Sequence, residues 1–436
     1  MKRNKKNFKR NISYTTRSIF RLFSSDKTES LPRTIKNAGI KVAFIHNEKR
    51  IHTGMHTGAA QINQLMARAL VVLGVQVKNF YPLHRLTDTP VHLRGISNIL
   101  FFYSMLEHKD KILKFDIIQG TTYTPLPFLA FSVPVVCHFG STSRGFLNSV
   151  PATKQLPEEE KKIFKELTKL NIIPELDLKT FRPMEDVADI EIVAASRSNT
   201  CVVTSDKVKN ELMEMGVSQE KIVLIHNAIE DYWFEPQRVV SVQSPHLVFL
   251  GRLGNDVFTL KLKGFARLVN FYRAFPDIPK TTICMTTNRK LKDWLRVSFP
   301  KHYMYTNLRK DLIPGALAPL FGSILFLSSR YEGFSLSLVE GMSQGLVPIS
   351  FSVGVAPEII KNGENGFIVF SEKEAEMRAK ELLGDEVKRL KMANAAKQTA
   401  IQFNSIRIAK ELLSLYRKIK EKHKNTIQEN HKQHLV

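Results

Sequence analysis

Short apolar runs alternate with amphipathic stretches from residue 39 onward. The segment 58–70 has apolar residues at helical spacing, which is typical of an amphipathic helix. The apolar runs with the length of buried strands are 39–46, 75–81, 115–119, 134–138, 200–204 and 221–226. Short apolar strands joined by helices indicate parallel pairing through crossover connections. The pattern therefore predicts a doubly wound α/β domain over residues 39–235.

A second alternation follows a polar segment at 236–245, which prolines bracket and which we interpret as a domain linker. Its expected strands are 246–250, 281–285, 323–327 and 346–350, with helices from about residue 263 and over 336–344. This predicts a second doubly wound domain over residues 243–405. Open α/β sheets bind ligands at the carboxyl ends of their strands, so two such domains predict a cleft between them.

Three further segments complete the predicted organisation. Residues 150–185 contain four prolines around a charged helical stretch, and we interpret them as an insertion in the first domain. Residues 406–436 form a C-terminal basic helix and tail, in which apolar residues at helical spacing up to 424 predict packing back on the first domain. Residues 1–38 form a basic N-terminal extension.

Length and charge narrow the class of protein. A chain of 436 residues is longer than one ordinary domain, and its 43% hydrophobic content is that of a folded protein. The net charge of +23 attracts polyanions. Residues 1–23 hold eight basic residues and no acidic one, without the apolar run of a secretory signal. This segment is either a basic helix on an anionic membrane or a disordered tail.

Several classes of site are absent from the sequence. The three cysteines, Cys137, Cys201 and Cys284, are far apart and form no CxxC pair, which predicts a reducing, cytoplasmic location without disulfides or structural zinc. No apolar stretch is long enough to span a bilayer, so we expect at most a peripheral association with the inner face of a membrane. Phosphate-loop, nucleophile-elbow, zinc-helix and RNA-recognition motifs are missing, and we expect no specific nucleic-acid partner.

The segment 328–369 carries the most chemical information. Glu332 follows a predicted strand, Gly333 and Phe334 form a turn, and Glu340 lies on the next helix. Carboxylates accept hydrogen bonds from vicinal hydroxyls, which sugars and riboses supply. The amides at the start of that helix, near Ser335, can bind a diphosphate. A capped helix with two solvated glutamates is the ordinary alternative, but the combined pattern favours a binding site.

This segment resembles the retaining glycosyltransferases of the GT-B class known as family 4. EGFSLSLVE at 332–340 is similar to their paired-glutamate signature, and 353–369 resembles the block that follows it. Further similar segments are Gly58-Ala59, 204–227 and FLGRL at 249–253 followed by Lys263-Gly264. The resemblance covers about residues 40–405. It implies a GT-B fold, with two Rossmann-like domains facing a cleft, and transfer of a sugar from a nucleotide-diphosphate sugar with retention of configuration.

The resemblance also implies roles for individual residues. The acceptor would bind the first domain and the donor the second. Glu332 would contact the hydroxyls of the transferred sugar, Glu340 the nucleoside ribose, and His138, at a strand end, the sugar. The alternative for His138 is a histidine that only caps a strand. The remaining donor-binding candidates are Gly58, Arg252, Lys263, Gly333, Phe334, Ser335 and Leu336. Arg252 and Lys263 would contact the diphosphate, where fixed cations stabilise a departing anion.

The sequence departs from the family in its spacing. Nine residues, GNDVFTLKL, separate Leu253 from Lys263, where the family has a shorter spacer, so Lys261 competes with Lys263 for the phosphate. His46, His52 and His56 lie in or beside the N-terminal loop without the carboxylates or cysteines of a metal site, and we expect neither a metal nor a cofactor beyond the donor.

The donor's base and sugar, the acceptor and the oligomeric state stay open. The basic ends of the chain favour a lipid-linked or membrane-bound glycan acceptor over other hydroxyl acceptors. Two other functions compete: epimerisation or hydrolysis of a nucleotide sugar on the same fold, and non-catalytic binding of anionic lipid or polymer.

Overall fold

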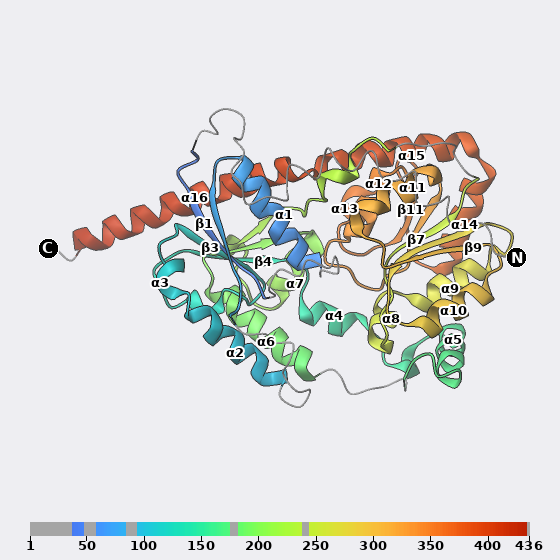
Figure 1. Cartoon of the computed structure of the whole chain (residues 1–436), viewed down its shortest axis with the longest axis horizontal. Coiled ribbons are helices and arrows are strands. Elements are labelled where there is room, and N and C mark those ends of the chain that lie inside the picture. The colour runs from blue at the N-terminus through green and yellow to red at the C-terminus, as the bar shows by residue number, and fades with distance from the viewer. Residues whose placement is uncertain (1–36, 48–57, 84–93, 175–181, 238–243, 434–436) are drawn as a thin grey trace, which may run out of the picture. The chain divides into compact units, whose positions relative to one another are not determined.

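The computed structural model describes residues 37–47, 58–83, 94–174, 182–237 and 244–433 (Figure 1). The basic segment 1–23 and the loop that contains His52 and His56 lie outside the described residues, as does most of the predicted linker. All three cysteines are buried and free. In the part of the chain that the structure describes, no helix has both the length and the apolar character needed to cross a bilayer.

The first sheet has six strands in the order β2-β1-β3-β4-β5-β6, all paired in parallel. They are β1 (Lys41–Ile45), β2 (Gln76–Phe80), β3 (Ile117–Thr121), β4 (Val135–Phe139), β5 (Thr200–Val203) and β6 (Ile222–Leu224). Side chains of β1 alternate between two apolar cores: Val42 and Phe44 enter one, Ala43 and Ile45 the other. Such a strand is apolar on both faces, which is why the sequence shows continuous hydrophobic runs.

The second sheet also has six parallel strands, in the order β12-β11-β10-β7-β8-β9. They are β7 (Leu247–Arg252), β8 (Lys280–Met285), β9 (His302–Thr306), β10 (Ile324–Leu327), β11 (Val347–Phe351) and β12 (Phe367–Val369). Strand order reverses between β7 and β10, and between β1 and β3 in the first sheet. Ligands of doubly wound sheets bind beside such reversal points, at the carboxyl ends of the strands.

Helices cover both sheets (Figure 1). Those nearest the first sheet in sequence are α1 (Gly58–Val72), α2 (Arg94–Leu106), α3 (Lys109–Ile112), α4 (Ser143–Ser149), α6 (Arg182–Arg197) and α7 (Asp206–Glu214). Those that follow β7 are α8 (Val257–Leu262), α9 (Phe265–Arg273), α10 (Arg289–Ser298), α11 (Ile313–Leu317), α12 (Leu336–Ser343), α13 (Ala356–Ile359), α14 (Glu372–Gly384), α15 (Glu386–Ala400) and α16 (Ser405–Gln433).

The doubly wound α/β class is confirmed, and every predicted strand is present within a few residues. Two edge strands and several helices, α8 among them, were not predicted individually. β9 alternates between half-buried and exposed positions, and β12 has only three residues, so neither forms a buried run of usual length. A helix does follow Lys263, namely α9, but the short helix α8 precedes it within the long spacer.

Two long helical segments pack far from their sequence neighbours. α16 packs along α1, and its Leu412 and Tyr416 join the core of the first sheet, as predicted. The insertion helix α5 (Glu158–Lys169) behaves differently from our interpretation. Its Ile163 and Phe164 belong to the apolar core of the second sheet, and α5 contacts α9. In sequence the insertion lies between β4 and β5, but it completes the apolar core of the second sheet. The predicted domain boundaries stay a prediction.

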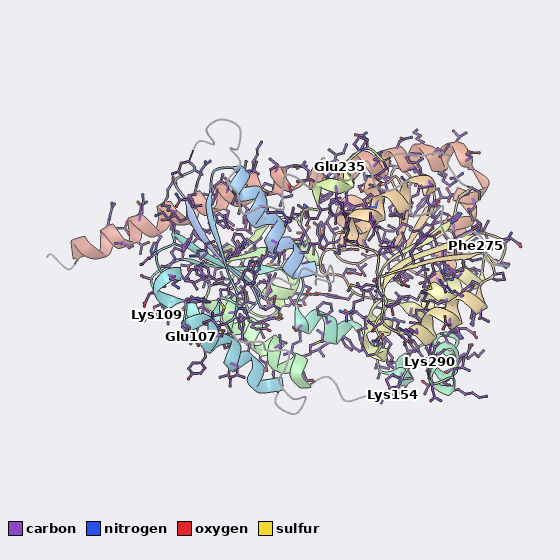
Figure 2. The ribbon with its side chains drawn as sticks, in the orientation of Figure 1. Glu107, Lys109, Lys154, Glu235, Phe275 and Lys290 are labelled. Atoms are coloured by element: carbon purple, nitrogen blue, oxygen red, sulfur yellow. The ribbon has the colours of Figure 1, made fainter. Side chains whose placement is uncertain are left out.

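Polar contacts also join the insertion to the second sheet. Trp294 of α10 donates from Nε1 to Glu166 Oε1 at 2.9 Å. Lys290 of the same helix, labelled in Figure 2, donates to the Asn171 carbonyl at 3.1 Å. Arg330, just after β10, donates to both carboxylate oxygens of the buried Glu160 at 2.6 Å. A charged helical pattern identified the helix in the sequence, but nothing in that pattern identified its partners.

Candidate active site

The reversal point of the second sheet brings two of the predicted residues together. Lys263 lies after β7 and Glu332 after β10, and Lys263 Nζ stands 2.6 Å from Glu332 Oε1. Ser329 donates a second hydrogen bond to the same oxygen at 2.7 Å. Both charged side chains are partly exposed, Lys263 by 21% and Glu332 by 14%. The pair can therefore meet a ligand while each charge keeps a partner.

A tight turn sets the position of Lys263. Gly264 has φ +60°, in the left-handed region, and a side-chain carbon there would overlap the carbonyl of Ser328 at the end of β10. Ser328 Oγ donates to the Lys263 carbonyl at 2.8 Å. The turn between α8 and α9 is thus packed directly on the end of β10, four residues before Glu332.

Lys261 faces a different part of the molecule. It is buried, and its ammonium donates to the Pro151 carbonyl at 3.2 Å and to Thr153 Oγ1 at 2.8 Å. These contacts join α8 to the start of the insertion. The long spacer and the insertion therefore contact each other. Lys263, not Lys261, lies beside Glu332.

The start of α12 has an unusual backbone. Ser335 is its N-cap residue and has φ +81°, which a residue with a side chain adopts only at an energetic cost. Its buried hydroxyl has no hydrogen-bond partner among the described residues. Phe334 precedes it, and its carbonyl accepts from Val355 N at 2.9 Å. The first two amides of α12, at Leu336 and Ser337, precede the first amide that bonds back to the N-cap, that of Leu338, and can bind an anion.

Glu340 lies on α12 and is 8% exposed. Burial raises the pKa of its carboxyl, the charge of Lys310 opposes that rise, and the charge of Glu230 adds to it. Glu340 is also the largest charge influence on Tyr232, whose phenol pKa is raised first by burial. This carboxylate is not part of the Lys263–Glu332 pair. A buried carboxylate of this kind favours a ligand that donates hydrogen bonds, such as a diol.

His138 lies near the carboxyl end of β4 and is almost fully buried. Its Nδ1 has no hydrogen-bond partner among the described residues. Burial lowers the pKa of His138 to about 4, so the imidazole is neutral at physiological pH. A neutral, incompletely paired imidazole at a strand end can hydrogen-bond a ligand, but it is a poor proton acceptor at pH 7.

For Arg252 and Gly58 the structure gives a position but, among the residues that it describes, no contact with the other predicted site residues. Arg252 is exposed at the end of β7. Gly58 is the first residue of α1, and the loop before it lies outside the described residues. Over the described ranges no group of three or more His, Cys, Asp or Glu side chains could hold a metal, and metal independence stays a prediction.

Two surface cavities among the described residues lie apart from the predicted site. One surface cavity is lined by residues 78–83 with His108 and Lys111. A second is lined by residues 197–199 and 220–221 with Lys422. Neither contains a predicted site residue. The site is therefore defined by the contacts of Glu332 with Lys263 and Ser329.

Sequence reasoning missed the partners of the predicted residues. Ser329 binds Glu332 from only three residues away, but serines occur too widely to be a signal. Glu211 and Ser205 of the first-sheet side contact the residues on either side of Glu332. Their sequence separations are 120 and 128 residues, and no local pattern could have shown them.

Comparison with known proteins gives one family match and one curated relative. Residues 318–399, which contain Glu332 and Glu340, match the family model described as Glycosyl transferases group 1. A protein of Klebsiella pneumoniae, described as an uncharacterized 41.2 kDa protein in the cps region, is 23% identical over 188 residues. That alignment covers 41% of this chain, and the chain spans 50% of the relative's length.

Solved structures show the fold. Sucrose-phosphate synthase from Thermosynechococcus elongatus has a TM-score of 0.66 at 14% identity, over 87% of this chain and 99% of that one. HepE from Anabaena, in complex with UDP, has a TM-score of 0.58 at 15% identity, over 87% of this chain and 100% of that one. The chain therefore carries a glycosyl transferases group 1 domain and has the GT-B fold of glycosyltransferases. Membership of family 4 and a retaining mechanism stay predictions.

Proposed function

We propose that this protein is a retaining glycosyltransferase that moves a sugar from a nucleotide-diphosphate sugar to a hydroxyl acceptor. The observation that carries the proposal is the Lys263–Glu332 pair, 2.6 Å apart at the reversal point of the second sheet. Glu332 lies within the segment that matches the glycosyl transferases group 1 model. The neighbouring start of α12 supplies free amides for an anionic group.

The chemistry follows from charge and position. A departing nucleoside diphosphate gains negative charge, which Lys263, Arg252 and the positive end of the α12 dipole stabilise. The Lys263 ammonium has three donors, so it can keep Glu332 and still bind phosphate oxygens. Glu332 accepts from hydroxyls of the transferred sugar, and Glu340 from those of the ribose. We nominate no protein nucleophile, because the leaving phosphate can accept the proton of the incoming hydroxyl on the same face.

His138 takes a hydrogen-bonding role in this proposal. Since burial keeps its pKa near 4, it is neutral at pH 7 and binds a sugar hydroxyl without acting as the base. No metal or further cofactor is required, because the positive charge comes from side chains and the helix start. This stays a prediction, which activity in the presence of a chelator tests.

The neighbours support a choice of donor and acceptor to test first. HepE was solved with UDP, so uridine donors come first. WaaG, a solved neighbour described as a glycosyltransferase involved in lipopolysaccharide biosynthesis, supports a glycan acceptor in polysaccharide synthesis. A lipid-linked acceptor would place the enzyme at a membrane, with residues 1–23 as the anionic-surface contact. Flotation with anionic vesicles, with and without residues 1–23, tests this, and equal failure to bind would remove the idea.

Thermal unfolding with UDP, GDP, ADP and CMP tests the donor site. A ligand at about 100 times its Kd adds roughly 2.7 kcal/mol to stability, which raises the midpoint by a few degrees. One nucleotide should raise it, and Glu340→Ala should abolish the effect. Turnover of the matching sugar nucleotide should then depend on an acceptor; turnover without one would indicate hydrolysis or epimerisation. No shift with any nucleotide, in folded protein, would favour a basic binder of anionic lipid or polymer.

A further inference from the structure

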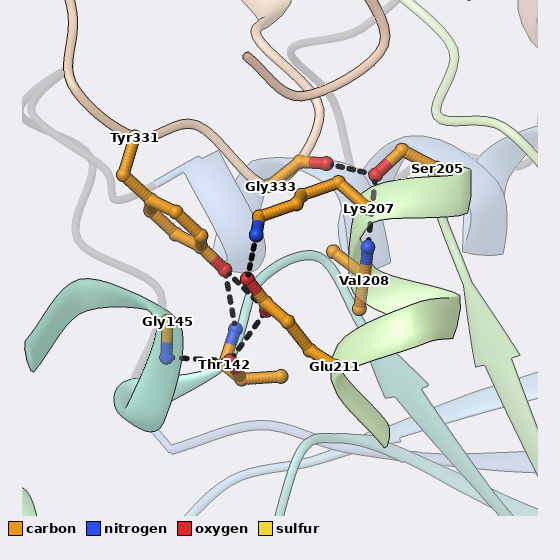
Figure 3. A network of polar contacts seen from close by, with 8 residues as sticks. All are labelled: Thr142, Gly145, Ser205, Lys207, Val208, Glu211, Tyr331 and Gly333. Atoms are coloured by element: carbon orange, nitrogen blue, oxygen red, sulfur yellow. Dashed lines mark hydrogen bonds and ion pairs between the residues drawn. The ribbon is translucent and has the colours of Figure 1, made fainter. Parts of the chain in front are cut away.

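The two residues on either side of Glu332 are both held by segments that follow strands β4 and β5 of the first sheet, which we call the first-sheet side. The Tyr331 hydroxyl donates to Glu211 Oε2 at 2.8 Å and accepts from the backbone amide of Thr142 at 3.1 Å (Figure 3). The carbonyl of Gly333 accepts a hydrogen bond from Ser205 Oγ (Figure 3). Glu332 stands between these two anchored residues.

The anchor at Tyr331 is buried and charge-assisted. Tyr331, Glu211 and Thr142 are all buried. Glu211 Oε2 also accepts from Thr142 Oγ1 at 2.6 Å, and Glu211 Oε1 lies 3.4 Å from the Lys207 ammonium. Burial raises the pKa of the Tyr331 phenol, so its hydroxyl keeps the proton that it donates. Hydrogen bonds to a carboxylate are the stronger kind, and water does not compete for a buried one.

Packing leaves these groups little freedom. A side-chain carbon at Gly145 would overlap the Tyr331 hydroxyl, and one at Gly333 would overlap the carbonyl of Gly140. Both glycines therefore permit an approach that no other residue allows. The segment 331–333 is seated against the first-sheet side by shape as well as by hydrogen bonds.

Helix α7 supplies both anchoring side chains. Glu211 lies on it, and Ser205 is its N-cap, accepting from Val208 N at 3.3 Å. A contact from the second-sheet side also holds this helix. Glu358 of α13 accepts from Asp206 N at 2.8 Å and lies 2.9 Å from His226 Nε2. α7 is thus fixed to the second-sheet side at its first turn, and the position of one helix sets that of the segment 331–333.

We infer that Glu211 and Ser205 are positioning residues, which act through Tyr331 and Gly333 to hold the Glu332 carboxylate in place. The inference rests on the proposed function, because it concerns the carboxylate that meets the transferred sugar. Fixing both neighbours fixes the backbone of Glu332, and Lys263 and Ser329 then orient the carboxylate from that backbone position. Small displacements of such a group slow chemistry far more than they weaken binding.

Tyr331→Phe tests the inference, because it removes one hydroxyl and keeps the buried ring. We expect kcat to fall roughly 10- to 100-fold, the loss that follows removal of a buried hydrogen bond to a carboxylate, with the donor KM within about threefold. Amide hydrogen exchange over residues 329–335 should become faster. Glu211→Gln, which keeps an acceptor, should lose less activity than Glu211→Ala. Tyr103→Phe is the matched control, because Tyr103 is 67% exposed on α2, and it should change neither quantity.

Two results would overturn the inference. One is Tyr331→Phe with the kcat and the exchange rates of the original protein. The other is a rise in KM without a fall in kcat, since that would make the network a binding element. Hydrogen exchange needs no substrate. A protein that turned over no nucleotide sugar would refute the proposed function, while the exchange experiment would still decide whether Tyr331 holds the segment.

Discussion

The two sheets present different chemistry at their carboxyl edges. The second sheet presents a cation and a carboxylate, Lys263 and Glu332, both partly exposed. The first presents His138, which is buried and neutral, and Glu191 of α6, also buried, binds Ser143 in the segment that follows β4. A departing diphosphate needs fixed charge, whereas a sugar hydroxyl needs a hydrogen-bond partner. Under the proposed function, the second sheet would provide the electrostatics of the reaction and the first sheet its geometry.

Lys263→Met should have the largest effect, because it removes the cation and leaves Glu332 without its main partner. Loss of one preorganised group that stabilises a developing anion lowers kcat by about 10²–10³, or roughly 3–4 kcal/mol. Steady-state turnover measures it. Lys261→Met is the control: it should lower the midpoint of thermal unfolding by detaching Pro151 and Thr153, with a smaller effect on kcat. Equal losses of kcat in both variants would contradict the assignment of Lys263.

Of the Lys263–Glu332 pair that this prediction concerns, the sequence shows Glu332 clearly. Glu332, Gly333 and Glu340 lie within nine positions, and a strand, a turn and a helix are enough to place them. Lys263 needed the structure, because the two lysines differ in their contacts: Lys263 meets Glu332, whereas Lys261 binds Thr153. Local patterns identify groups that share one turn. They do not identify which of two nearby lysines faces that turn.

Burial was harder to predict than position. His138 was expected at a strand end, and it lies there, but its depressed pKa comes from surroundings that several distant segments build. The insertion shows the same limit, since its helix was evident and its packing on the second core was not. Contacts such as Tyr331 with Glu211 join residues 120 positions apart and leave no local signature.

Glu191→Gln should sharpen the comparison on the first-sheet side. Glu191 accepts from Ser143 N at 2.8 Å and from Ser143 Oγ at 3.1 Å, and burial raises its pKa to about 7. A raised folded-state pKa means stability that is fully present below about pH 4.5 and is lost as pH rises through about 7. At pH 8 the loss is on the order of 3 kcal/mol, which the neutral glutamine should remove.

Urea unfolding of both proteins at pH 5, 6, 7 and 8 measures this effect. His138 acts in the opposite sense, because its lowered pKa adds stability as pH rises from about 4 toward 6.5. The difference between variant and original protein at each pH cancels the His138 contribution and isolates Glu191. A difference that does not change with pH would show that Glu191 ionises normally in the folded protein.

Gly333→Ala should directly break the contact between the segment 331–333 and the Gly140 backbone that follows β4. The added methyl group would overlap the Gly140 carbonyl, and backbone on both sides must move to admit it. Forced overlap of this kind costs about 1–3 kcal/mol of stability, measured by urea unfolding. Gly384→Ala is the control, because nothing lies within 4 Å of a side-chain carbon there. If the two alanine variants were equally stable, the close approach at Gly333 would not exist in solution.

The smallest effect concerns the insertion, the segment that belongs to one sheet by sequence and to the other by packing. Trp294→Phe keeps an aromatic ring near Phe265 but removes the donor to Glu166, which should cost about 1 kcal/mol of unfolding free energy. Glu166→Gln keeps an acceptor and loses only the exposed pair with Arg273, so its cost should stay below about 0.5 kcal/mol.

A double-mutant cycle of Trp294→Phe with Glu166→Leu separates this hydrogen bond from general packing. The coupling between the two changes should be roughly 1 kcal/mol if the bond holds α5 against α10. Additive effects would mean that apolar packing alone docks the insertion. In that case the second core would hold this segment through Ile163 and Phe164, and the polar contacts would add specificity without stability.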